Sequence, residues 1–212
     1  GIAGLVASGR TELAEAIFGA ERYDGGAIEI NGKKVAIHST NDGKRHSIGL
    51  LTEDRKETGL VLSYDLIRNI TITNLDKVKR GPFLSARLEQ ELATRHAKEL
   101  SVKTPSMKQF AMNLSGGNQQ KVVFAKWLFS DVDILILDEP TRGIDVGAKY
   151  EIYLLMNQLA AQGKSIIMIS SELPEVLGMS DRLIVLSGGE KVGELDRDHA
   201  TAEAVMALAV KN

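Results

Sequence analysis

The sequence has 212 residues, of which 43% are hydrophobic and 25% charged, with a formal net charge of −2. This composition is ordinary for a globular protein of one large domain, and it lacks the basic excess of nucleic-acid binders, so we expect no nucleic-acid partner. The absence of cysteine excludes disulfides and thiolate metal sites, and the four scattered histidines do not favour a metal site built from protein ligands alone.

The first fifty residues alternate strand and helix patterns. GIAGLV, residues 1–6, predicts the end of a buried strand, and TELAEAIFG, residues 11–19, predicts a helix that stops at Gly19. AIEI and KKVAI flank Asn31-Gly32, a strong hairpin signal, and IGLL at 48–51 predicts a further strand. Because the sequence begins inside a strand pattern and with Gly1 instead of Met, we expect it to be a fragment with further sequence upstream.

The middle of the chain has a different character. Strand patterns disappear from about Ser63 to Met112, and RLEQELATRHAKEL, residues 87–100, is helical and mostly polar. We therefore predict a helical subdomain at about residues 63–130, inserted into the α/β core.

The last third returns to alternation. DILILDEP at 133–140 predicts a strand followed by a turn, and a helix is expected from Val146 to Gln162, with Val146, Tyr150, Tyr153 and Leu154 on one face. SIIMIS predicts a strand, RLIVL and EKVGEL flank Gly188-Gly189 as a hairpin, and ATAEAVMALAV predicts a closing helix. Strands that alternate with helices predict a largely parallel sheet.

The first motif is GLVASGRTE, residues 4–12, which has the spacing of a phosphate-binding loop, G-x-x-x-x-G-K-[ST], with Arg10 in place of the lysine. Backbone N–H groups of such a loop and the start of the following helix point at phosphates, and Thr11 would place a hydroxyl on Mg²⁺. The residues expected at the nucleotide are Gly4, Ser8, Gly9, Arg10, Thr11 and Glu12. The alternative is a glycine turn between a strand and a helix.

The second motif is the acidic end of DILILDEP. Asp138 ends an apolar strand at the edge of the sheet where ligands bind, and it is expected to hold Mg²⁺ through water. Glu139 is placed to polarise an attacking water and is the candidate catalytic residue. The alternative is a buried strand that ends in a solvated acidic turn.

The third motif is LSGGNQQK, residues 114–121, in which Ser115, Gly116, Gly117 and Asn118 open a helix and could bind an anion or only cap the helix. With this motif the whole chain resembles the ATP-binding cassette (ABC) family, whose signature is LSGG-Q. DEPT and RGID, residues 142–145, match the same family in order and spacing, and Asp145 falls in its D-loop. The resemblance implies an α/β P-loop NTPase fold across residues 1–212, with a mainly parallel sheet, antiparallel β-hairpins and an inserted helical subdomain.

A finer resemblance rests on GRTEL, EDRK (53–56), LSGGNQQK and DEPTRGIDVGAK, which look like the second ATPase half of bacterial ribose-, galactose- and xylose-type monosaccharide importers. It implies ATP and Mg²⁺ as cofactors and an upstream cassette in the same polypeptide, paired head to tail with this one. It also implies integral membrane permease subunits, an indirect link to a periplasmic sugar-binding protein, and a place on the cytoplasmic face of the inner membrane. The helical lobe and the loop 53–56 are where the family contacts its membrane partner.

The sequence departs from the family at three positions around the γ-phosphate. Arg10 replaces a lysine, Glu53 stands where a glutamine contacts Mg²⁺ and water, and Ser171 stands where a histidine contacts the γ-phosphate. Serine is neither a cation nor a strong proton carrier at neutral pH. We therefore expect this half to hold nucleotide and hydrolyse it weakly, and to supply Ser115, Gly116 and Gly117 to the partner half's site.

Two alternatives stay open at this point. The chain could be a nucleotide clamp or regulatory module with no ATPase activity of its own. It could also be a cassette protein of DNA repair or translation, although the coiled-coil insertions, zinc cysteines and basic linkers of those proteins are absent from the sequence.

Overall fold

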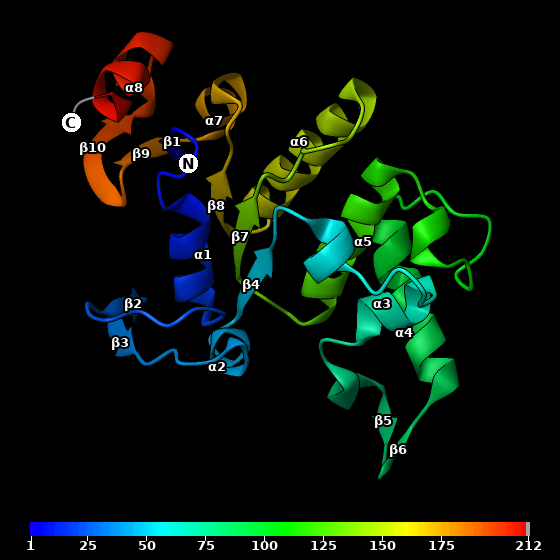
Figure 1. The fold of residues 1–212 in the computed structure, drawn as a ribbon. Helices are drawn as coiled ribbons and strands as arrows, with labels where there is room; N and C mark the ends of the chain where they lie inside the picture. Colours follow the sequence, from blue (N-terminus) through cyan, green and yellow to red (C-terminus); the bar gives the residue numbers. More distant parts are fainter. Residues whose placement is uncertain (211–212) are drawn as a thin grey trace. The chain divides into compact units, whose positions relative to one another are not determined.

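The computed structural model describes residues 1–210, which form two compact units (Figure 1). The first unit comprises Gly1–Leu50, Ile134–Pro140 and the residues from Ser165 onward, and the second comprises Leu51–Asp133 and Thr141–Lys164. The segment at about 63–130, predicted to be an inserted helical lobe, falls within the second unit.

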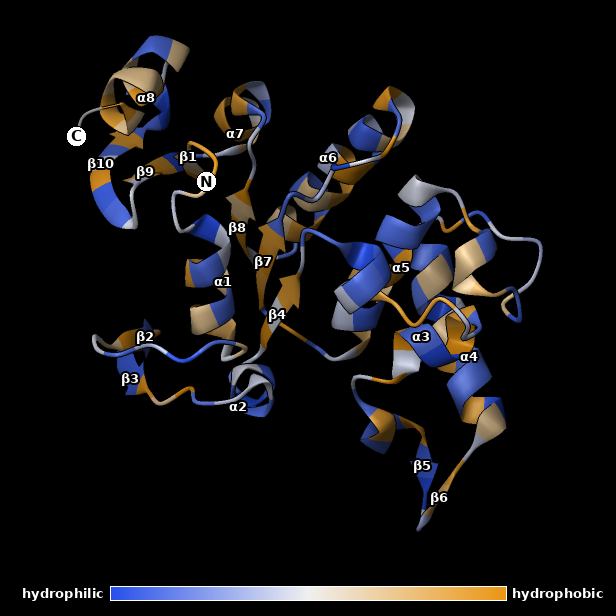
Figure 2. Ribbon diagram, in the orientation of Figure 1, coloured by the Kyte–Doolittle hydropathy of each residue, from blue (hydrophilic) through white to orange (hydrophobic). Residues whose placement is uncertain are grey.

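The first unit is built on a six-stranded, mostly parallel sheet. In sheet order its strands are β10 (Glu190–Asp196), β9 (Arg182–Ser187), β1 (Ile2–Gly4), β8 (Ser165–Ile169), β7 (Ile134–Asp138) and β4 (Ile48–Leu51). Strand β1 runs parallel to both β8 and β9, and β7 runs parallel to β8. Strands β4, β7 and β8 are predominantly hydrophobic along their length (Figure 2), as expected for strands buried on both faces. The predicted parallel α/β core is confirmed.

Two antiparallel hairpins turn where glycine and asparagine permit a left-handed backbone. β2 (Ile28–Ile30) pairs with β3 (Lys33–Val35) through Asn31 and Gly32, whose φ angles are +52° and +72°. β9 pairs with β10 across the Gly188-Gly189 turn, as the sequence predicts.

Among the described residues, the α-helices of the first unit are α1 (Arg10–Phe18), α2 (Thr40–Arg45), α7 (Leu173–Met179) and α8 (Ala202–Ala209). Helix α1 ends at Gly19, whose φ of +86° is the left-handed C-cap that glycine favours. Helices α7 and α8 pack on β1 and β9 around a buried cluster that consists of Ala3, Val176, Leu183, Val185, Val205 and Ala209.

The second unit is mainly helical. Its helices are α3 (Leu66–Thr71), α4 (Ala86–Glu99), α5 (Gly116–Phe129) and α6 (Val146–Ala161), with a single π-helical turn, η1, at Arg55–Gly59. Helix α5 contacts α3, α4, α6 and η1. Its Val122, Phe124 and Phe129 are fully buried, and the polar side chains of Gln119, Gln120, Lys121 and Lys126 are buried as well.

The structure differs from the sequence-based expectation in several elements. The short helices α2 and α7 were not predicted. A small hairpin of β5 (Lys79–Arg80) and β6 (Phe83–Leu84) lies in the stretch where no strand was predicted, because two-residue strands are too short to show a period.

On α6 the predicted apolar face is largely solvent-exposed: Val146, Tyr150 and Leu154 are 84%, 62% and 50% exposed. The buried residues of the helix are Ile152, Leu155, Met156 and Leu159. Apolar residues occupy two faces of α6, so periodicity could not tell which face is inside. Within residues 1–210, no helix is both long and apolar enough to span a membrane.

Candidate functional site

The predicted site residues are divided between the two units. The glycine loop, Asp138, Glu139 and Ser171 belong to the first unit, whereas Glu53, the signature residues and Asp145 belong to the second. Each set is therefore described by itself.

The glycine loop connects the end of β1 at Gly4 to the start of α1. It contains two left-handed residues, Ala7 with φ of +61° and Gly9 with φ of +90°. A Cβ atom at Gly9 would lie 3.2 Å from Cα of Gly189, and one at Gly4 would lie 2.5 Å from the carbonyl oxygen of Leu186. Both glycines are thus required by backbone conformation or close approach.

The start of α1 is suited to an anion. No side chain caps the helix, and the first N–H groups of a helix lack intrahelical partners. Ser8 is only 3% exposed, and its Oγ has no hydrogen-bond partner within the described residues. Glu12 is exposed in the first turn. An unpaired buried hydroxyl beside open N–H groups fits a phosphate.

Thr11 and Asp138 meet at the end of β7. Thr11 Oγ1 donates a hydrogen bond of 2.7 Å to Oδ2 of Asp138, which is 2% exposed. Burial raises the pKa of Asp138, repulsion from Glu139 adds to the rise, and the Thr11 hydrogen bond and the Arg10 charge oppose it. A buried carboxylate beside a hydroxyl fits a divalent cation.

The described residues contain no group of three or more His, Asp or Glu side chains that could hold a metal ion. Mg²⁺ is commonly held by one or two carboxylates together with substrate phosphates. The pair Thr11 and Asp138 fits that arrangement and not a cage made of protein ligands.

Arg10, in the lysine position, has a partner in the protein. Its Nη1 donates a 2.9 Å hydrogen bond to the carbonyl oxygen of Ser170, just after β8. The guanidinium is therefore held by the backbone, whereas the compact ammonium of a lysine would move more freely beneath phosphates.

Glu139 is held by the segment that follows β8. Its φ is +49°, and its N–H donates to the carbonyl oxygen of Ile169 at 2.9 Å. Its Oε1 accepts a 2.6 Å hydrogen bond from the backbone N–H of Ser171, whose own side chain is exposed. The candidate base is thus oriented by the main-chain N–H of Ser171.

In the second unit, Ser115 is the N-cap position of α5, but its side chain makes no capping hydrogen bond. Its Oγ accepts a 2.9 Å hydrogen bond from Nδ2 of Asn118, whose Oδ1 accepts one of 2.7 Å from the N–H of Lys103. Ser115 is exposed, so the open end of α5 is accessible to a ligand. A Cβ at Gly117 would lie 2.6 Å from Cβ of Ala148, so a glycine is required there.

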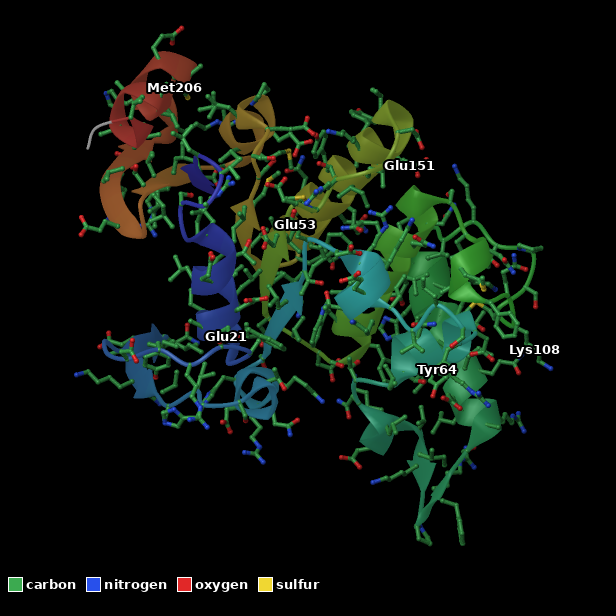
Figure 3. The ribbon with its side chains drawn as sticks, viewed as in Figure 1. Glu21, Glu53, Tyr64, Lys108, Glu151 and Met206 are labelled. Carbon is green, nitrogen blue, oxygen red and sulfur yellow. The ribbon has the colours of Figure 1, made fainter. Side chains whose placement is uncertain are left out.

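Glu53 and Asp145 both have partners within the second unit. Glu53, labelled in Figure 3, lies in the loop after β4. It forms an ion pair with Arg142. Asp145 caps α6, because its Oδ1 accepts a 3.0 Å hydrogen bond from the N–H of Ala148.

Two further groups were not predicted. Arg55 donates to the carbonyl oxygens of Arg142 and Gly143. Glu151, labelled on α6 in Figure 3, pairs with Lys121 at 2.7 Å and Lys103 at 3.1 Å, and these hydrogen bonds lower its pKa, that of Lys121 most. The only signals in the quoted motifs were the charges of Arg55 in EDRK and of Lys121 in LSGGNQQK, and a charge alone does not specify its partner.

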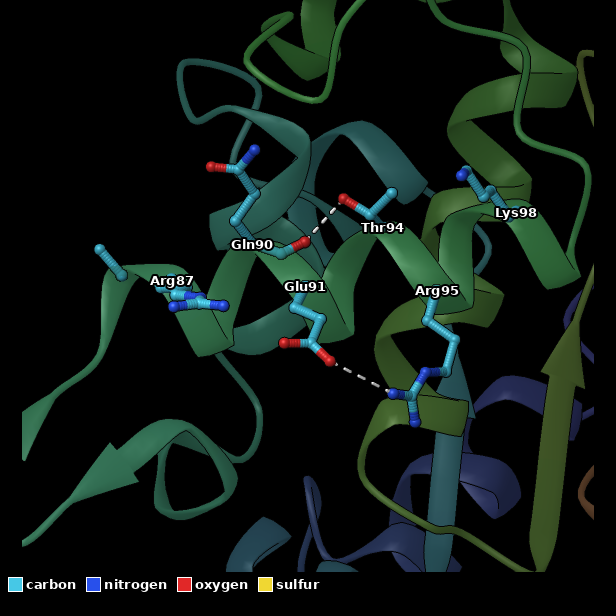
Figure 4. A pocket seen from close by; sticks show the side chains of 7 residues that line it. Arg87, Gln90, Glu91, Thr94, Arg95 and Lys98 are labelled. Carbon is cyan, nitrogen blue, oxygen red and sulfur yellow. Dashed lines mark hydrogen bonds and ion pairs between the residues drawn. The ribbon is translucent and has the colours of Figure 1, made fainter.

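A shallow hollow of about 740 Å³ runs along α4 (Figure 4). It contains none of the predicted site residues. The residues that line it are Ala86, Arg87, Gln90, Glu91, Thr94, Arg95 and Lys98.

Comparison with known proteins connects these sites to one family. The profile of the ABC transporter family matches residues 1–142. The chain is 53% identical over its whole length to a putative ribose/galactose/methyl galactoside import ATP-binding protein of Burkholderia lata, and covers 41% of that protein. It is 52% identical, over 99% of its length, to a ribose import ATP-binding protein of Bacillus cereus, and covers 42% of it. The chain thus spans about two fifths of the length of these relatives and matches their C-terminal part.

Solved structures agree in fold. A dimeric ATP-binding cassette bound to ADP and Pi aligns with a TM-score of 0.76 and 22% identity, over 92% of this chain and 84% of the other. A nucleotide-free cassette from an ABC transporter aligns with a TM-score of 0.83 and 18% identity, over 100% of this chain and 87% of the other. The predicted P-loop NTPase fold is confirmed.

Proposed function

Since the chain belongs to the ABC transporter family, we propose that it is the second nucleotide-binding half of the ATP-binding protein of a bacterial ribose- or galactose-type sugar importer. The relatives named above support this role, because their identity of 52–53% extends over essentially the whole chain. The partner is a first cassette, expected in the same polypeptide and paired head to tail with this half.

The two halves would divide the work. The glycine loop of this chain holds ATP with Mg²⁺, and the exposed Ser115 end of α5 completes the site whose glycine loop belongs to the partner. One observation carries this division: Glu139, the candidate base, is bound to the N–H of Ser171 at 2.6 Å, where a histidine would otherwise reach the γ-phosphate. A base whose neighbour cannot carry a proton favours retention of nucleotide over turnover.

The residues of the first unit have positional and electrostatic roles. The N–H groups at the start of α1, with the Ser8 hydroxyl, bind phosphate oxygens, and Thr11 and Asp138 hold the cation. MgATP supplies the phosphoanhydride bond whose hydrolysis drives the cycle. At the partner's site, Ser115 and the N–H groups that follow it stabilise negative charge on the γ-phosphate.

Association with the membrane would be peripheral. We place the chain at the cytoplasmic face of the inner membrane, bound to permease subunits through the loop 53–56 and linked through them to a periplasmic sugar-binding protein. The loop is suited to such a contact because its Asp54 and Lys56 are exposed and charged.

Two substitutions test the division of labour in the full-length ATP-binding protein assembled with its permease. Ser115→Arg should abolish ATP hydrolysis, because it fills the open end of α5 with a bulky cation. Glu139→Gln should leave the rate within about twofold of wild type, because turnover occurs at the other site. Ser106→Arg, at an exposed serine of the same unit, is the matched control for the added charge and should be neutral.

The opposite result, loss of hydrolysis in Glu139→Gln, would show that the Arg10 site turns over ATP. Nucleotide binding at the Arg10 site is measured on the Ser115→Arg protein. Complete absence of binding there would refute the proposal that the glycine loop of this chain holds ATP.

A further inference from the structure

The side chain of Arg55 contacts two other segments of the second unit, one at the start of α5 and one just before α6. Arg55 opens the turn η1, and its Nη1 and Nη2 donate hydrogen bonds to the carbonyl oxygens of Arg142 at 2.8 Å and Gly143 at 3.3 Å. These two carbonyls belong to the segment that leads into Asp145. One planar guanidinium therefore binds two successive carbonyls with two separate nitrogens, which a lysine cannot reproduce.

The same side chain reaches the signature helix. Arg55 Nε lies 3.4 Å from Oε1 of Gln119, and Gln119 is itself fixed, being buried with Nε2 donating to the carbonyl oxygen of Ala111 at 3.0 Å. A Cβ at Gly116 would lie 2.7 Å from Nη2 of Arg55. The absence of a side chain at this signature glycine thus makes room for the guanidinium.

The loop that carries Arg55 is held at both ends. Asp54 caps η1 by accepting from the N–H of Lys56 at 2.8 Å, and the buried Lys126 donates to the carbonyl oxygen of Gly59 at 2.6 Å. Glu53 adds an ion pair to Arg142. The loop is thus held by contacts of its own on both sides of Arg55.

Burial lowers the pKa of Arg55, which reflects the cost of removing a guanidinium from water. Three acceptors compensate for that cost. Hydrogen bonds from a charged guanidinium are stronger than those between neutral groups. The Arg55 side chain therefore links the loop 53–56 to the segments that carry these three oxygens.

We propose that Arg55 is a positioning residue that ties the loop 53–56 to both ligand-facing segments of the second unit, Ser115–Gln119 and Arg142–Asp145. Through this contact, a push on the loop by a membrane partner moves the signature and the D-loop together. The inference rests on the proposed function for its consequence, but the contact itself is a property of this chain.

The first experiment measures the contact without activity. Hydrogen exchange of the full-length protein is compared between wild type and Arg55→Lys. The substitution keeps the positive charge and removes the guanidinium, which donates through several nitrogens. Amides of 142–145 and 116–119 should exchange at least about threefold faster in the variant, with Tm changed by less than about 2 °C. Gly116→Ala should give the same pattern, because its methyl group displaces the guanidinium.

The matched control is Arg95→Lys, at an arginine paired with Glu91 on the exposed face of α4 (Figure 4). It should leave both segments unchanged. Exchange that stays at the wild-type rate in Arg55→Lys, or that rises throughout the second unit together with a fall in Tm, overturns the proposal.

The second experiment measures coupling. In the assembled transporter, Arg55→Lys should reduce the stimulation of ATP hydrolysis by permease at least about fivefold, while KM for ATP changes by less than about twofold. If wild type is not stimulated by the permease, the proposed function fails and the exchange result still decides the contact. If wild type is stimulated and Arg55→Lys retains that stimulation, the role of Arg55 fails alone.

Discussion

At the scale of single residues, three polar side chains of the site in the first unit each make a defined contact. Thr11 donates to Asp138, Arg10 donates to Ser170, and Glu139 accepts from Ser171. The last two of these contacts engage the groups that would act on a γ-phosphate, whereas the first presents a hydroxyl and a carboxylate suited to a cation. The proposal that this site binds nucleotide and hydrolyses it weakly rests on these contacts.

Asp138→Asn tests the electrostatic cost of this site. Because the pKa of Asp138 is raised in the folded state, the native protein holds that proton more tightly than the unfolded chain. Its contribution to stability is present at low pH and is lost as pH rises from the unfolded value through the raised folded pKa. We expect Asp138→Asn to raise Tm by about 2 to 4 °C at pH 7.5 and by less at pH 4.5.

The comparison needs thermal melts at both pH values, with Asp133→Asn as control because Asp133 is exposed near the start of the same strand. A gain in Tm that is equal at pH 7.5 and pH 4.5 would contradict the inference that burial destabilises the ionised carboxylate of Asp138.

At the scale of elements, the starts of three helices carry the proposed function. Helix α1 begins in the glycine loop, α5 begins at the signature, and α6 begins at Asp145. The first two starts lack a side-chain capping bond, and only Asp145 caps its helix. An uncapped helix start keeps its N–H groups available for an anion, so the two open ends are the ones expected at phosphates.

Asp145 offers a test of the capped end. Asparagine caps a helix about as well as aspartate, whereas alanine does not, so Asp145→Ala should lower the free energy of unfolding by about 1 kcal/mol and Asp145→Asn by much less. Denaturant titration of both variants measures the difference. Equal destabilisation by Ala and Asn would indicate that the charge of Asp145, and not its cap, stabilises α6.

At the scale of the whole molecule, a ligand that binds only the folded chain must stabilise it. If the glycine loop holds nucleotide through Thr11 and Asp138, MgATP at about 100 times its Kd should add about 2.7 kcal/mol. For a chain of this size that corresponds to a rise in Tm of roughly 5 to 10 °C.

Chelation of Mg²⁺ with EDTA should remove most of this rise, and Thr11→Val should make the remaining shift insensitive to EDTA. The measurement is a thermal melt of the purified protein with and without ATP, Mg²⁺ and EDTA. A full shift by ATP in the presence of EDTA would contradict a cation held by Thr11 and Asp138.

Local patterns predicted most of the elements. The turns at Asn31-Gly32 and Gly188-Gly189, the stop at Gly19 and the glycine loop between β1 and α1 were all expected and observed, because a few residues set the backbone conformation there. The π-turn at Arg55–Gly59 and the hairpin β5–β6 were missed, because neither is long enough to display a period.

By itself, the sequence determined the α/β class, the order of the elements and the motifs, since each depends on residues close together in the chain. Only the tertiary structure decided the partner of each polar group: Arg10 finds Ser170, which is 160 residues away, and Arg55 finds Arg142, which is 87 residues away. It also decided that Val146, Tyr150 and Leu154 face solvent. The physical reason is that tertiary packing determines which elements come close enough to form a hydrogen bond or to bury a helix face. The periodicity of the sequence does not specify which element that is.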